Sequence, residues 1–223
     1  MTGPFIITLD GPAGVGKSSL AKRLADRFGI AYLDTGAMFR ATAWKLGEGA
    51  WEWEALRMET ALKELEFSLS GCGAGSVLSL NGVPLTDEIR TETVGMWASN
   101  MARIPAVRTC QKDAQRSIGA TTSLIAEGRD MGTVIFPQAP CKFFLDADLR
   151  ERARRRFLQL QEMGRPADME ELVEQIGARD DQDRNRKVAP LKPAEDAILV
   201  DTTSLDIEGV FERLVAEVEK RKS

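Results

Sequence analysis

The sequence contains no histidine among its 223 residues. Histidine is the usual general base near neutral pH and a common metal ligand, so its absence excludes histidine-dependent hydrolase triads and histidine metal sites. Only three cysteines are present, Cys72, Cys110 and Cys141, and their spacing does not follow a metal-binding pattern. We therefore expect free thiols and a reducing compartment, the cytoplasm.

Long apolar runs are also missing, whereas a membrane-spanning helix needs about 20 consecutive apolar residues. No basic stretch followed by an apolar segment opens the sequence, so we expect no secretory signal and no membrane partner. The net charge is −4, and aromatic residues make up only 6% of the chain. An acidic chain with few rings for base stacking is not expected to bind nucleic acid, although a local basic patch could still bind another anion.

Short apolar runs that favour strands alternate with helical patterns. These runs cover residues 5–9, 31–33, 123–126, 141–145 and 197–200. Helical spacing of apolar residues marks residues 18–28 and 207–218, and Ser204 is a candidate N-cap for the second of these helices. The alternation predicts an α/β fold with a parallel sheet.

Two regions depart from this alternation. Residues 35–100 contain helical patterns at 37–46 and 51–65 and then a hairpin-like piece at 66–80 with Asn81-Gly82 as a turn signal, which together indicate an insertion. Residues 149–187 are rich in arginine and predict two helices around the break at 163–166. Such a pair of helices could move as a unit.

The first strand leads into a glycine-rich segment, GPAGVGKS, at residues 11–18. It fits the pattern G-x-x-x-x-G-K-[ST] at every fixed position, with a strand before it and a helix after it. Glycines let backbone N–H groups curl around phosphates, Lys17 can reach the β- and γ-phosphates, and the Ser18 hydroxyl can bind Mg²⁺. The alternative is a turn that only joins strand to helix. The residues expected to hold ATP are Gly11, Pro12, Ala13, Gly14, Val15, Gly16, Lys17, Ser18 and Ser19.

Two further segments follow strands at the edge where parallel sheets bind ligands. Asp34 and Arg40 follow the second strand, and their alternative interpretation is an N-cap and a surface arginine. Arg129 and Asp130 follow the third strand, and they could equally form an ordinary polar turn. In a functional site, the Arg129 guanidinium would bind a phosphate, while the Asp130 carboxylate would accept hydrogen bonds from a base edge.

Arginines are dense at residues 150–156 and 179–187. Because only residues three or four apart share a helix face, the five arginines of the first cluster cannot all face one ligand, and two or three of them are expected in solvent. In an acidic chain, the remainder need carboxylates or an anionic partner, and a polyphosphate at Lys17 would supply that partner.

These motifs resemble those of bacterial-type cytidylate (CMP) kinases, a family of P-loop nucleoside monophosphate kinases. The resemblance covers nearly the whole chain and is most selective in GRDMGTV at 128–134 and RDDQDRNR at 179–186. It implies a P-loop kinase fold with a five-stranded parallel sheet flanked by helices, in one domain. Its expected parts are a CORE (1–34, 101–148 and 188–223), an NMP-binding insertion (35–100) and a helical LID (149–187).

The resemblance also implies the activity, which is ATP- and Mg²⁺-dependent phosphorylation of CMP and dCMP by a monomer. The implied catalytic residues are Lys17, Arg129, Arg179 and Arg186. The implied substrate-binding residues are Thr35, Arg40, Ser99, Arg108, Arg129, Asp130, Arg179, Asp183 and Arg186. Among these, Ser99 and Asp130 are expected near the cytosine and Asp183 near the sugar. One departure is Phe39, which stands where the family often has tyrosine.

Other functions remain open from the residues alone. A P-loop kinase could act on a different small acceptor, such as shikimate or another nucleotide, and a P-loop protein could also be a nucleotide-dependent switch that transfers nothing. The absence of an N-K-x-D motif argues against a small GTPase. A second set of arginines, separate from the P-loop, favours a kinase over a switch.

Overall fold

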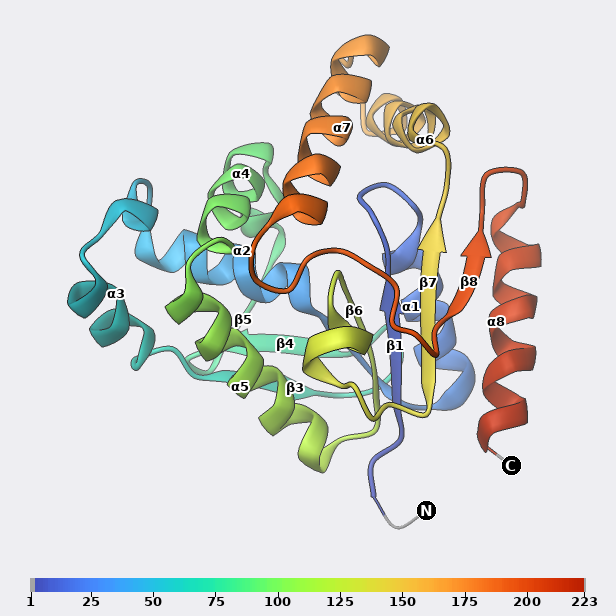
Figure 1. The fold of residues 1–223 in the computed structure, drawn as a ribbon, viewed down its shortest axis with the longest axis horizontal. Coiled ribbons are helices and arrows are strands. Elements are labelled where there is room, and N and C mark those ends of the chain that lie inside the picture. The colour runs from blue at the N-terminus through green and yellow to red at the C-terminus, as the bar shows by residue number, and fades with distance from the viewer. Residues whose placement is uncertain (1–2, 223) are drawn as a thin grey trace. The chain divides into compact units, whose positions relative to one another are not determined.

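The computed structural model describes residues 3–222, which form two compact units. Unit 1 contains the residues up to 6 and residues 25–128, and unit 2 contains residues 7–24 and those from 129 onward. Figure 1 shows the elements of both. The predicted division into CORE, NMP-binding insertion and LID stays a prediction.

The parallel sheet contains all five strands expected from the sequence. They are β1 (Ile6–Asp10), β2 (Ala31–Asp34), β6 (Leu124–Gly128), β7 (Cys141–Asp146) and β8 (Ile198–Asp201), in the order β2-β6-β1-β7-β8. All five residues of β1 are buried, which explains why this strand lacks the apolar–polar alternation of a half-exposed strand. In unit 2, Asp10 at the end of β1 pairs in register with Phe144 of β7.

Unit 1 is mainly helical, with a small antiparallel sheet. Its helices are α2 (Thr35–Leu46), η1 (Ala50–Glu52), α3 (Ala55–Leu62), η2 (Asp87–Arg90), α4 (Glu92–Met101) and α5 (Pro105–Thr121). The small sheet contains β3 (Phe67–Ser70), β4 (Val77–Leu80) and β5 (Val83–Pro84), and the Asn81-Gly82 turn joins the last two. The predicted helix at 51–65 is wrong in extent, because the extended backbone of Trp53 separates a 3₁₀ turn from the shorter α3.

The remaining helices are α1 (Lys17–Phe28), the single π-helical turn η3 (Met131–Ile135), α6 (Leu149–Glu162), α7 (Met169–Asn185) and α8 (Ile207–Lys222). In unit 2, α6 and α7 pack against each other through a small apolar cluster and turn at Gly164, as the sequence predicted (Figure 1). The expected N-cap at Ser204 is wrong. Asp206 caps α8 instead, since its Oδ1 atom accepts a hydrogen bond from the Gly209 amide at 2.8 Å.

Within residues 3–222, no helix combines the length and the apolar character that crossing a membrane would require.

Candidate active site

The glycine-rich segment between β1 and α1 follows a path that disfavours a side chain at Gly11 and at Gly14. Gly11 has a φ of +150°, and a Cβ atom there would lie 2.2 Å from the Leu145 carbonyl oxygen. Gly14 has a φ of +76°, and its Cβ atom would lie 3.2 Å from the Arg152 carbonyl oxygen. The glycines therefore allow the loop to lie against β7 and α6 of unit 2. The loop ends where α1 begins, so the positive end of the α1 dipole lies next to it.

Lys17, the first residue of α1, folds back over this loop. Its ammonium group donates a hydrogen bond to the Pro12 carbonyl oxygen at 2.7 Å, and the residue is buried. The next two residues, Ser18 and Ser19, are exposed at the helix start. A strand precedes this loop and a helix follows it, as the sequence predicted, while the binding roles of the lysine and the two serines stay predictions.

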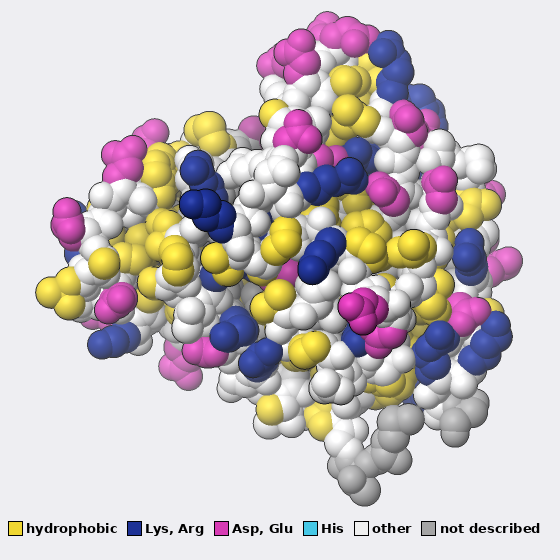
Figure 2. Space-filling model, viewed as in Figure 1, with side chains coloured by type: hydrophobic (Ala, Val, Ile, Leu, Met, Phe, Trp, Pro, Cys, Tyr) yellow, Lys and Arg dark blue, Asp and Glu magenta, His cyan; other side chains and the backbone are white. Residues whose placement is uncertain are grey.

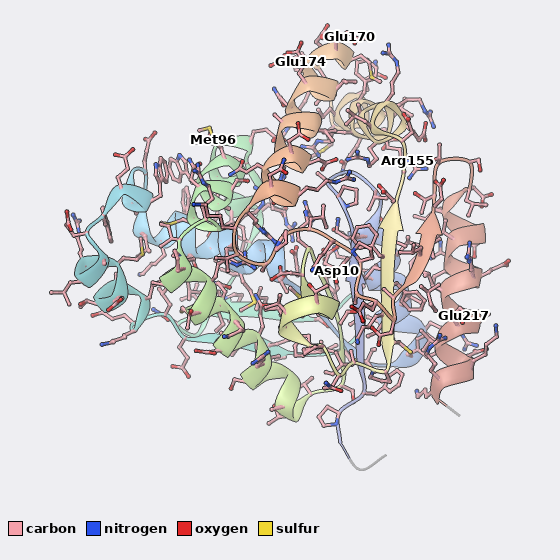
Figure 3. All side chains as sticks on the ribbon, viewed as in Figure 1. Asp10, Met96, Arg155, Glu170, Glu174 and Glu217 are labelled. Atoms are coloured by element: carbon pink, nitrogen blue, oxygen red, sulfur yellow. The ribbon has the colours of Figure 1, made fainter. Side chains whose placement is uncertain are left out.

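Asp10, which the sequence analysis did not select, links this loop to the segment after β6 (Figure 3). Its carboxylate accepts hydrogen bonds from the amides of Met131 at 2.9 Å and Gly132 at 2.8 Å. Burial raises the pKa of Asp10 to about 6 and the charge of Asp130 adds to this, while the two amides and Lys17 oppose it. The start of the P-loop and the start of η3 are therefore fixed to each other.

Residues from the two selective motifs form one charge network in unit 2. The Arg129 Nε atom donates to Asp183 Oδ2 at 2.7 Å. The Arg186 guanidinium contacts Asp183 Oδ1 at 3.5 Å and Asp130 Oδ1 at 3.4 Å. Arg129 and Asp130 thus meet Asp183 and Arg186, which lie 54 and 56 positions further along the sequence, through direct contacts.

Electrostatics brings a fifth predicted residue, Arg179, into this network. Burial alone would raise the pKa of Asp183, but the positive charges of Arg129, Arg179 and Arg186 hold it below its usual value. Asp183 is therefore a carboxylate at neutral pH. The positive charges of three guanidinium groups therefore act on one carboxylate.

The arginines of α6 divide into anchored and exposed groups. Arg152 is buried, and Arg155 donates to the hydroxyl and the carbonyl oxygen of Thr202 at 3.0 and 2.5 Å. Arg150 and Arg154 are exposed and form ion pairs, which confirms that two arginines of this cluster lie in solvent. Figure 2 shows charges of both signs on the exterior of the α6–α7 pair.

In unit 1, the residues around the end of β2 are held by hydrogen bonds. Thr35 is buried, and its hydroxyl donates to the Glu127 carbonyl oxygen at 2.6 Å. Asp34 caps α2 by accepting a hydrogen bond from the Ala37 amide at 2.8 Å, and it forms a 3.2 Å ion pair with Arg90. The N-cap interpretation of Asp34 is therefore confirmed.

Arg40 of α2 is held by backbone groups rather than lying loose on the surface. Its Nη1 atom donates to the carbonyl oxygens of Ile89 at 3.2 Å and Thr91 at 2.9 Å. A Cβ atom on Gly95 would lie 2.8 Å from Arg40 Nη2, so glycine at this position of α4 leaves room for the guanidinium.

Arg108 near the start of α5 is buried beside an aromatic ring. Its guanidinium carbon lies 5.7 Å from the centre of the Phe39 ring, and its Nη1 atom donates to the Ala102 carbonyl oxygen at 3.4 Å. This cation–π contact needs only the ring, so phenylalanine in place of tyrosine still provides it. The last predicted residue of unit 1, Ser99, is partly buried on α4.

The described residues suit a magnesium ion that is bound together with phosphates. Within residues 3–222, no group of three or more acidic or cysteine side chains could hold a metal ion by itself. Mg²⁺ commonly takes one or two protein ligands and completes its shell with phosphate oxygens and water. The exposed Ser18 hydroxyl at the start of α1 fits such a partial site.

The sequence and the fold are similar to those of known proteins. The family model described as "Cytidylate kinase" matches residues 7–220. A cytidylate kinase from Maridesulfovibrio salexigens is 80% identical over 221 residues, which is 99% of each chain. One from Oleidesulfovibrio alaskensis is 55% identical over 96% of this chain and 98% of its own. Among solved structures, an uncharacterized protein from Eubacterium ventriosum has a similar fold, with a TM-score of 0.51 at 14% identity over 97% of this chain and 99% of its own.

Proposed function

The chain belongs to the cytidylate kinase family and is a nucleoside monophosphate kinase that phosphorylates CMP with ATP. We propose that it also phosphorylates dCMP, and that the residues of the candidate active site described above carry out the reaction. The observation that supports these roles is the arrangement in unit 2. There, Asp10 connects a complete P-loop to the segment that carries Arg129 and Asp130.

The acceptor in this reaction needs no general base. A nucleotide phosphate has a second pKa near 6 and is therefore mostly dianionic at neutral pH, so it can attack without losing a proton. This agrees with a chain that has no histidine. The barrier is instead the approach of two polyanions, which positioning and positive charge must overcome.

We assign the phosphates of ATP to the P-loop amides, Lys17 and the start of α1. Ser18 is the residue that would hold Mg²⁺, which when bound would supply positive charge beside the phosphate oxygens. Arg129, Arg179 and Arg186 would hold the acceptor phosphate and the group being transferred. Within this network, Asp183 orients Arg129 and Arg186 through the contacts that it already makes.

Base selection in this proposal depends on Asp130. Cytosine presents an amino donor where uracil presents a carbonyl acceptor, and a carboxylate can only accept. Asp130 is buried, so pairing it with uracil would leave two acceptors facing each other. We therefore expect CMP and dCMP to be preferred over UMP. Thr35, Arg40, Ser99 and Arg108 of unit 1 are the further proposed contacts of the acceptor nucleotide.

A cytoplasmic location and a monomeric state also remain proposals. All three cysteines are free thiols, and one of them, Cys72, is exposed, which suits a reducing compartment. Light scattering on the purified chain would test the monomer directly.

The decisive experiment measures ADP formation from MgATP with a panel of acceptors that includes CMP, dCMP, UMP, AMP and shikimate. We expect rapid turnover with CMP and dCMP, slower turnover with UMP and none with shikimate. Lys17→Ala is the control, and we expect it to lose this turnover. Binding of ATP without turnover by any acceptor would indicate a switch protein, and preference for another acceptor would refute the base assignment.

A further inference from the structure

A buried ion pair in unit 2 lies directly against the P-loop. Arg152 in the first turns of α6 and Asp180 of α7 are 3% and 5% exposed, and Arg152 Nη1 lies 2.6 Å from Asp180 Oδ2. The Arg152 Nε atom also donates to the Ala147 carbonyl oxygen at 2.9 Å. Both partners are therefore withdrawn from solvent and held by several contacts.

The two charged groups share one further partner, the backbone of Ala13. Arg152 Nη1 donates to the Ala13 carbonyl oxygen at 3.0 Å, and the Ala13 amide points to Asp180 Oδ1 at 3.4 Å. At the next residue, Gly14, the missing Cβ would lie 3.3 Å from the Cβ atom of Arg152. One residue of the P-loop is thus held from both sides of its backbone by a guanidinium and a carboxylate.

Asp180 also has a defined relation to the charge network. It follows Arg179 directly, and Asp183 lies three positions further along α7, so Asp180 and Asp183 occupy neighbouring surface of the helix. Fixing Asp180 against Ala13 therefore fixes the rotation of α7 about its axis. That rotation determines where Arg179 and Asp183 point.

We propose that Arg152 and Asp180 form a positioning pair that sets the path of the P-loop at Ala13 and, at the same time, the orientation of α7. Neither residue is assigned a contact with substrate. The inference rests on the proposed function, because it takes the P-loop as the ATP site and α7 as the carrier of acceptor-binding residues. Arg152 has a second role, which is to neutralise a carboxylate that would otherwise repel the phosphates.

The test replaces the pair by apolar side chains of similar size, Arg152→Met together with Asp180→Leu. Exchanging a buried ion pair for packed apolar groups often leaves a protein as stable as before, so we expect an unchanged unfolding midpoint. The matched control is Arg150→Met with Glu170→Leu, which removes an exposed ion pair between the same two helices. Within residues 3–222, the described ion pair and hydrogen bond of these two side chains do not involve the P-loop.

For the Arg152/Asp180 double variant, we expect the KM for MgATP to rise at least tenfold and kcat with CMP to fall at least tenfold. The control should stay within about twofold of the wild type in both. Wild-type kinetics in the double variant would overturn the proposal. Equal losses of activity in the control double variant would also overturn the proposal, because they would mean that any ion pair between α6 and α7 has this effect.

Single variants provide a second measure that does not depend on the double variant folding. Arg152→Lys keeps the charge but lacks the planar fork that contacts Ala147, Ala13 and Asp180 together, so it should raise the KM for MgATP. Asp180→Asn keeps a hydrogen-bond acceptor for the Ala13 amide and removes the negative charge, so it should lower kcat with a smaller change in the KM for MgATP. Wild-type values for both single variants would refute the pair.

MgATP binding measured by calorimetry separates this inference from the proposed function. A wild-type chain that does not phosphorylate CMP would refute the function, yet weaker MgATP binding in the double variant than in the control would still support the pair.

Discussion

The buried carboxyl of Asp10 should make the stability of the protein depend on pH in an unusual direction. Burial and the charge of Asp130 raise the pKa of Asp10 from 3.8 to about 6 in the folded chain. The folded state therefore holds this proton more tightly than the unfolded state does. The stabilisation from this group is complete below pH 3.8 and is lost as the pH rises through 6.

The magnitude follows from the difference of about 2 pKa units. At about 1.4 kcal/mol per unit, ionisation of Asp10 lowers the free energy of unfolding by about 3 kcal/mol, and most of this change falls between pH 4 and pH 7. In Asp10→Asn the group no longer titrates. Each carboxylate oxygen of Asp10 accepts from one amide, so in asparagine the NH₂ group replaces one of these acceptors and faces the amide of Met131 or Gly132.

The assay is urea unfolding of wild type and Asp10→Asn at several values of pH from 4 to 8. Circular dichroism is the suitable probe, because all four tryptophans (Trp44, Trp51, Trp53 and Trp97) belong to unit 1 and Asp10 belongs to unit 2. We expect the stability of the wild type relative to the variant to fall by about 2–3 kcal/mol across this range.

Asp196→Asn is the control of opposite sign. A hydrogen bond from Lys142 lowers the pKa of Asp196, so its contribution is present above its unfolded pKa and is lost as the pH falls. Parallel stability curves for wild type and Asp10→Asn would refute the reasoning, because they would mean that Asp10 titrates alike in the folded and unfolded chain.

Three further substitutions test the site. Gly11→Ala would place a Cβ atom 2.2 Å from the Leu145 carbonyl oxygen, so we expect the KM for MgATP to rise at least tenfold, and an unchanged value would contradict the described loop path. Gly95→Ala would displace the Arg40 guanidinium, so the KM for CMP should rise about tenfold while the KM for MgATP stays constant. Steady-state kinetics with each substrate varied in turn would measure both constants. Equal changes in the two KM values would argue against a role of Arg40 in binding CMP. Asp130→Asn should lower the ratio of kcat/KM for CMP over UMP about ten- to a hundredfold, and an unchanged ratio would remove Asp130 from base reading.

Structural features that depend on residues close together in the sequence could be predicted from the sequence. The P-loop was recognisable because its glycines and its lysine lie within eight residues, and the structure shows that Gly11 and Gly14 adopt the positive φ values that the motif implies. The five strands and the α6–α7 pair were predicted for the same reason, since apolar runs and the break at Gly164 are local signals. Arg129 and Asp130 could be selected from their position after a strand, whereas Arg179, Asp183 and Arg186 were singled out only through the resemblance.

Elements whose pattern is interrupted by buried polar residues were missed. Helix α5 carries Gln111 and Gln115, both 1% exposed, on its buried side, so its apolar periodicity is weak. The Gln111 side chain donates to the Thr42 hydroxyl at 2.8 Å, a contact between residues 69 positions apart. A polar residue that is satisfied only by such a distant partner looks in the sequence like a surface residue.

The positioning residues were missed for the same physical reason. Asp10 contacts residues about 120 positions away, and Ala13 contacts Arg152 and Asp180 across 139 and 167 positions. Arg152 was one of several arginines in a dense cluster, and nothing in its local sequence separates it from the exposed Arg154. A signal for Asp10 did exist, because a carboxylate at the end of a fully buried strand must find hydrogen-bond donors.

Four buried or half-buried carboxylates in unit 2, at Asp10, Asp130, Asp180 and Asp183, raise the question of how this region could bind anions at all. Each of them is offset by donors in the described contacts: Asp10 by two amides and a raised pKa, Asp180 by Arg152, and the other two by guanidinium groups. Each aspartate holds the amide or guanidinium groups that balance its own negative charge. The four aspartates therefore orient the arginines and the loop instead of repelling a phosphate. Removing one acid should therefore misplace its cation more than it strengthens the positive field, so neutral variants of these aspartates should bind phosphates no better than the wild type.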